Sequence, residues 1–114
     1  MQMQEATNQL CEAIRQSPEY LEYSRYKAEI DADSGISALV KEYKRLQVNV
    51  QMRMLSGQGM DDDDGRRFQQ LGALLFADQR TSAYLLSEMR LQQMMGKVFE
   101  KLTRAAGMEM PMPV

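Results

Sequence analysis

The stretch Ser34–Ser56, SGISALVKEYKRLQVNVQMRMLS, decides the fold. Apolar residues recur along it in a heptad-like seam of about three repeats. They are Ile36, Leu39, Tyr43, Leu46 and Val50, with Val40 and Met54 alongside. This spacing predicts one helix about 35 Å long, whereas a compact domain of this size has a radius of gyration of only ~13 Å. We therefore expect the helix either to pack along another long helix or to project from the domain.

A second long helix is predicted over residues 82–106. Its first apolar stripe repeats every seven residues and contains Tyr84, Leu91, Met95, Val98, Leu102 and Ala105. A neighbouring stripe contains Leu85, Met89 and Phe99. An apolar surface this wide is more than one partner helix covers. We expect this helix to run antiparallel to the first one and also to contact another subunit.

Three further helices complete the prediction. They cover 2–16, 18–30 and a segment from the acidic run Asp61–Asp64 to about Gln79. Ser17 is a good N-cap and Pro18 suits the first helical position, while Gly107 suits a helix C-terminus. No alternating apolar–polar run indicates a strand. The expected fold is all-α, a bundle of about five helices over residues 1–107, with 108–114 as a flexible C-terminal tail.

Composition limits the function. The 114 residues carry a net charge of −2, so no basic excess favours direct binding of nucleic acid. No apolar run reaches the ~20 residues of a membrane span, and the N-terminus lacks the features of a signal peptide. With one cysteine, no internal disulfide can form. We expect a cytoplasmic protein.

Enzymatic chemistry has little support in these residues. The chain has no histidine, which removes the commonest general base and metal ligand. Cys11 could supply only one ligand, and we expect it to be a small buried apolar residue. The run Asp61–Asp64 fits a helix start in a solvated loop better than a Ca²⁺ or Mg²⁺ site. We expect no catalytic residue, no metal and no cofactor.

The basic residues are interpreted as solvated helix faces. Arg66 and Arg67 follow the acidic run, and Lys41, Lys44 and Arg45 surround Glu42. With acidic residues so near, phosphate contacts are the weaker interpretation.

Three short segments carry a resemblance to a known family. They are Ser17-Pro18-Glu19-Tyr20, Leu39-Val40-Lys41-Glu42-Tyr43 and Ala83-Tyr84-Leu85. Over roughly Leu10 to Ala106 the chain resembles the YlbF/YmcA family of small bacterial cytoplasmic proteins. The resemblance implies a self-associating helical fold and a regulatory role, because some members assemble with partners and modulate an RNA-degrading endoribonuclease. Some members are linked to iron–sulfur clusters through cysteines, but this sequence has only Cys11.

The leading functional hypothesis is therefore a homo-oligomeric regulatory adaptor that binds proteins, with an endoribonuclease assembly among its partners. The alternative is a self-assembling or chaperone-like protein that holds apolar client segments. The predicted oligomer interface is Tyr43, Leu46, Val50, Met54, Leu91, Met95, Val98 and Leu102. The same periodicity fits a core within one chain equally well. Val50→Asp is expected either to unfold the chain or to split the oligomer.

Overall fold

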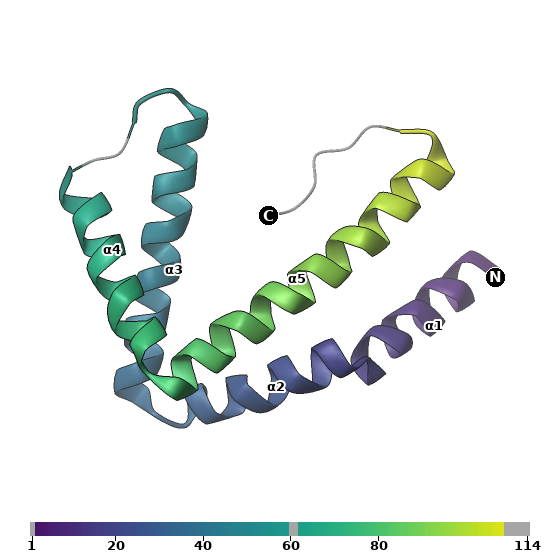
Figure 1. Ribbon diagram of the computed structural model, residues 1–114. Helices are drawn as coiled ribbons and strands as arrows, with labels where there is room; N and C mark the ends of the chain where they lie inside the picture. Colours follow the sequence, from purple (N-terminus) through teal and green to yellow (C-terminus); the bar gives the residue numbers. More distant parts are fainter. Residues whose placement is uncertain (1, 60–61, 109–114) are drawn as a thin grey trace. The chain divides into compact units, whose positions relative to one another are not determined.

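The computed structural model describes residues 2–59 and 62–108, and these residues form helices without any strand. The helices are α1 (Gln2–Gln16), α2 (Pro18–Asp31), α3 (Ser34–Leu55), α4 (Asp62–Ala77) and α5 (Gln79–Ala106) (Figure 1). The predicted all-α fold is confirmed. Of the expected C-terminal tail, Met108 is exposed and 109–114 lie outside the described residues.

Side-chain caps set the helix boundaries at two places that the sequence indicated. The Ser17 hydroxyl accepts a hydrogen bond from the Tyr20 amide at 3.2 Å and donates one to the Ile14 carbonyl at 2.6 Å. The Asp33 carboxylate accepts from the amides of Gly35 and Ile36, both at 3.1 Å. These bonds satisfy amides that a helix N-terminus leaves without intrahelical partners.

The chain forms two compact units, which are described separately. The hairpin unit, residues 27–85, contains the end of α2, all of α3 and α4, and the start of α5. The arm unit, residues 1–26 and 86–114, contains α1, most of α2 and most of α5.

In the hairpin unit, α3 packs along α4 (Figure 1). The buried apolar side chains are Ile30, Val40, Tyr43, Leu46, Val50, Leu75, Tyr84 and Leu85. The Tyr43 ring stacks on Phe68 of α4 with centroids 4.9 Å apart. A Cβ added at Gly72 would lie 3.3 Å from Tyr43 Cε1, so the glycine makes room for the tyrosine ring. We expected α5 to be the partner along α3, whereas in this unit that partner is α4.

The turn between α4 and α5 is built by two polar side chains. The Asp78 carboxylate accepts from the amides of Arg80 and Thr81, at 2.8 and 3.3 Å. The Thr81 hydroxyl donates to the Leu75 carbonyl, and the side chain is 1% exposed. Because Asp78 caps α5, that helix begins at Gln79, three residues before the predicted start at Ser82.

The arm unit differs from the hairpin unit in how little its helices cover one another. All buried apolar side chains of the described residues belong to the hairpin unit, and α1 has no buried residue. A salt bridge joins Glu22 of α2 to Arg90 of α5. Cys11 is exposed, which corrects our expectation that it is buried, because no part of α1 is covered deeply enough to bury it.

Candidate protein-interaction surfaces

The predicted interface residues divide between the two units. Tyr43, Leu46 and Val50 are 9%, 0% and 8% exposed, so they fill the core within the chain. That placement is the alternative which the periodicity left open. Five residues keep accessible surface, namely Met54, Leu91, Met95, Val98 and Leu102. For these five, a role in an oligomer interface stays a prediction.

The arm unit presents an apolar surface on α5. Leu86, Met89, Met95 and Leu102 are 42%, 50%, 41% and 53% exposed. A pocket of about 390 Å³ lies on this part of α5 and on α2. It is lined by Tyr23, Glu88, Leu91, Gln92, Met95, Gly96 and Phe99. Apolar surface of this kind, rimmed by polar side chains, is typical of protein contact sites.

The hairpin unit presents a second apolar stripe, on α3. Val48, Met52 and Leu55 are 52%, 63% and 88% exposed. Spacings of four and three residues place them on one helix face. This stripe was not predicted from the sequence, because the stronger buried seam runs along the same helix. A search for a second helical period in Ser34–Leu55 would have found it.

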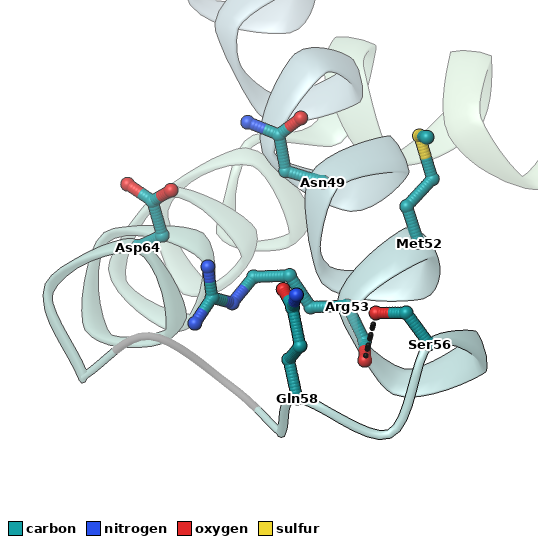
Figure 2. Close-up of a pocket in the computed structure, with 6 residues that line it drawn as sticks. All are labelled: Asn49, Met52, Arg53, Ser56, Gln58 and Asp64. Carbon is teal, nitrogen blue, oxygen red and sulfur yellow. Dashed lines mark hydrogen bonds between the residues drawn. The ribbon is translucent and has the colours of Figure 1, made fainter.

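A pocket of about 420 Å³ adjoins this stripe at the C-terminal end of α3 (Figure 2). It is lined by Asn49, Met52, Arg53, Ser56, Gln58 and Asp64. Arg53 Nε donates to the Gly59 carbonyl at 3.1 Å, and the Ser56 hydroxyl donates to the Arg53 carbonyl at 3.1 Å. Gly59 has φ of 72°, a value that favours glycine. The loop thus holds the arginine side chain at the pocket.

Charged groups tie α3 to α4 beside the core. Glu42 Oε1 accepts from Arg45 Nη2 at 2.6 Å and from Arg67 Nη2 at 3.0 Å. The hydrogen bond from Arg45, with the charges of Arg45 and Arg67, lowers the pKa of Glu42. Burial raises the pKa of Tyr43. Nearby, Lys44 Nζ donates to the Tyr84 hydroxyl at 2.7 Å and lies over the Tyr84 ring.

The residue types at these two surfaces can be compared with those that catalytic and metal sites use. The lining residues of the two pockets include no cysteine and no histidine, so they lack the commonest nucleophile–base pairs. Within 2–59 and 62–108, no three Cys, Asp or Glu residues are grouped as a metal site would need. Over the same described part of the chain, no helix has the length and apolar character to cross a membrane.

Comparisons with known proteins match nearly the whole chain. Residues 3–105 match the family model described as "Control of competence regulator ComK, YlbF/YmcA". A UPF0342 protein of Halothermothrix orenii is 24% identical over 91 residues, which are 80% of this chain and 77% of the relative. A UPF0342 protein of Staphylococcus aureus strain JH9 is 25% identical over 91 residues, 80% of each chain.

A solved structure has the same fold. It is described as a protein of unknown function (DUF964) from Bacillus stearothermophilus. The TM-score is 0.74 at 15% sequence identity, and the match covers 94% of each chain. At this identity the likeness supports the helical fold alone.

Proposed function

Because the chain belongs to the YlbF/YmcA family, we propose that it is a non-enzymatic regulatory protein of the cytoplasm, which acts by binding other protein chains. The family description names control of a competence regulator, and neither that description nor the relatives' names indicate a catalytic family. One structural observation carries the proposal. The described residues of the arm unit include no buried apolar side chain, yet the unit's longest helix segment exposes a run of large apolar residues.

Self-association is the first part of the proposal. Leu91, Met95, Val98 and Leu102 of α5 repeat at spacings of three and four residues and all keep accessible surface. Each apolar side chain that leaves water contributes roughly 1.5–3 kcal/mol when fully buried. A second copy that covers this seam would give the arm unit the apolar contacts that its own helices lack.

The mass of the protein in solution tests self-association. We expect light scattering after size exclusion to give a multiple of 13.1 kDa for the wild type at micromolar concentration. Leu102→Glu should shift the protein toward the monomer. Leu74→Glu is the matched control, because Leu74 is 57% exposed and lies on α4 of the other unit. A wild type that is strictly monomeric would contradict self-association.

The second part concerns the partner. We propose that the oligomer, as some members of the family that it resembles do, binds an RNA-processing assembly that contains an endoribonuclease and modulates its activity. Purified wild type and Leu102→Glu would each be added to the host's endoribonuclease, and the RNA cleavage pattern compared. A change of cleavage with the wild type supports this role. Unchanged cleavage, together with no endoribonuclease in affinity purification from the host, would contradict it.

The exposed methionines favour a chaperone-like alternative. Met52, Met54 and Met89 are each at least half exposed, and methionine adapts to many apolar partners. Binding of unrelated apolar peptides with similar affinity would support this alternative. Discrimination among such peptides would favour the regulatory adaptor.

A further inference from the structure

The C-terminal turn of α5 directs the chain back toward the apolar side of that helix. The Gly107 amide donates to the Arg104 carbonyl at 3.1 Å. The Met108 amide donates to the Thr103 carbonyl, also at 3.1 Å. With φ of 66° at Gly107, these two bonds form a Schellman motif, in which the residue after the glycine commonly contacts an apolar residue of the preceding turns. Here that residue is Leu102. Met108 and Leu102 are 59% and 53% exposed, so both leave apolar surface for a further segment to cover.

The segment that follows, residues 109–114, has the sequence of an extended apolar ligand. These residues lie outside the described part of the chain, and they read Glu-Met-Pro-Met-Pro-Val. Apart from the first, none has a charged or polar side chain. Each proline fixes φ and disfavours helical backbone in the residue before it. Because alternate side chains of an extended backbone share one side, we expect Met110, Met112 and Val114 to form one apolar edge.

The side of α5 that carries Leu102 also carries an apolar groove. At about 100° per residue, Met95, Phe99 and Leu102 lie within about 60° of one another around the helix axis. The pocket of about 390 Å³ lies along this side, and Tyr23 of α2 lines it together with Met95 and Phe99. Grooves with aromatic walls are the surfaces that proline-rich segments recognise. The groove thus fits the chemistry of residues 109–114.

We propose that residues 109–114 fold back along α5 and occupy this groove within the same chain. Six extended residues span about 20 Å, which equals the rise of about 13 residues of α-helix. The segment is therefore long enough to reach from the last turn of α5 to Gln92, which also lines the pocket. Because the docked segment covers Met95 and Leu102, it competes with a second copy for the α5 seam. This consequence for assembly rests on the self-association proposed above, whereas the docking does not.

Tethering favours the chain's own segment over that of a second copy. A segment joined by a short linker is present at an effective concentration in the millimolar range, whereas a second copy at micromolar concentration supplies roughly a thousandth of that value. The prolines favour docking further, because they reduce the conformational entropy that the free segment loses when it becomes ordered. Docking within one chain is therefore independent of protein concentration.

Disulfide trapping tests the docking in the full chain. Cys11 is the only cysteine, so a Cys11→Ser background carries no other thiol. Val114→Cys is combined in this background with Gln92→Cys, or with Gln93→Cys as the matched control. Gln93 has the same side chain and is exposed like Gln92, but it lies about 100° further around the axis and lines a different pocket. Oxidised glutathione at nanomolar protein concentration should close the Gln92 pair at least about fivefold faster than the Gln93 pair.

The expected product is a disulfide within one chain, seen as a faster band on a non-reducing gel. Met112→Glu places a charge on the apolar edge and should abolish the difference between the two pairs. Equal rates for the Gln92 and Gln93 pairs without Met112→Glu would show that the segment does not select the groove, and would overturn the proposal. A disulfide that forms only between two chains would assign the groove to the segment of a second copy, which also overturns docking within one chain.

The concentration dependence of assembly measures the competition separately. Light scattering across a range of concentrations would compare the full chain, a form that stops after Met108, and the full chain with Met112→Glu. We expect both variants to assemble at roughly fivefold lower concentration, because a seam that is free in only about one chain in five has its apparent affinity reduced by that fraction. Unchanged or weaker assembly of the shortened form would overturn the competition, and the weaker result would place residues 109–114 in the oligomer interface. If no form assembles, the competition fails with the proposed self-association, while the crosslinking rates still decide whether the segment docks.

Discussion

The hairpin unit and the arm unit are built from the same kind of amphipathic helix, but they use it differently. In the hairpin unit, α3 and α4 pack together, and with the neighbouring ends of α2 and α5 they enclose the eight buried apolar side chains found among the described residues. In the arm unit, α1 and residues 86–106 of α5 are periodic in the same way but bury no apolar side chain. The difference shows that apolar periodicity gives a helix one apolar face. A core forms only where a second apolar face packs against it.

The largest expected effect comes from placing a charge in each seam. Val50→Asp puts a carboxylate at a site that is 8% exposed. An uncompensated buried charge costs roughly 3–5 kcal/mol, so we expect the hairpin unit to unfold in urea titrations followed by circular dichroism. The sequence left two outcomes open for this variant, unfolding of the chain or dissociation of the oligomer. Because Val50 is buried, we expect unfolding.

Val98→Asp is the matching change in the arm unit, where Val98 is partly exposed. We expect the helical circular dichroism signal of this variant to persist. The mass of the assembly in solution should fall toward that of one subunit. If Val98→Asp unfolded the protein as fully as Val50→Asp, the contrast between the two units would be wrong.

A smaller effect is expected from one hydroxyl. The Thr81 hydroxyl is buried and donates to the Leu75 carbonyl. Thr81→Val removes this donor from a buried acceptor, which costs about 1–3 kcal/mol. Thr103→Val is the control, since Thr103 makes the same kind of bond, to the Glu100 carbonyl at 2.9 Å, at an exposed site. Equal losses of unfolding free energy in the two variants would show that burial does not separate the units.

Loss of a helix cap is expected to have different effects on hydrogen exchange in the two units. Asp78→Ala removes the cap of α5 beside the hairpin core and should cost about 1 kcal/mol. Ser17→Ala removes a cap in the arm unit and should cost a similar amount locally. By hydrogen exchange, we expect Asp78→Ala to speed exchange throughout the hairpin unit. Ser17→Ala should affect only the amides near the start of α2.

The smallest effect is a dependence on pH. The bond from Arg45 lowers the pKa of Glu42 below its ordinary 4.5, so the ionised form stabilises the folded state. This stabilisation is present above the unfolded value and is lost as the pH falls through the lower folded value. Glu42→Gln should therefore flatten the decline of melting temperature below about pH 4.5. A wild-type decline that persists unchanged in Glu42→Gln would contradict the role of this carboxylate.

The sequence predicted the helices well because their signals are local. Ser17 and Asp33 mark boundaries through bonds that reach only two or three residues along the chain. It did not predict that α4 packs along α3, since an apolar stripe does not specify which helix will cover it. That choice depends on fitted shapes, such as Gly72 against Tyr43 and Phe68 stacked on that tyrosine.

The candidate surfaces were predicted only in part. The exposed residues of the α5 seam were named from periodicity, but Tyr43, Leu46 and Val50 belong to the core. Periodicity cannot separate these two cases, because a buried face and a contact face have the same spacing. A second helical period in the sequence already marks the outer stripe of α3, whereas the exposure of Cys11 depends on how little of α1 the neighbouring helices cover.

The distribution of methionine gives the surface a chemical sensitivity that the core does not share. In the described part of the chain no methionine is buried, and Met52, Met54, Met89 and Met95 of the candidate surfaces are exposed. Oxidation converts the methionine thioether to a polar sulfoxide, a change that methionine sulfoxide reductases reverse. A mild oxidant would therefore make both candidate contact surfaces polar and leave the valine, leucine and tyrosine core of the hairpin unit untouched.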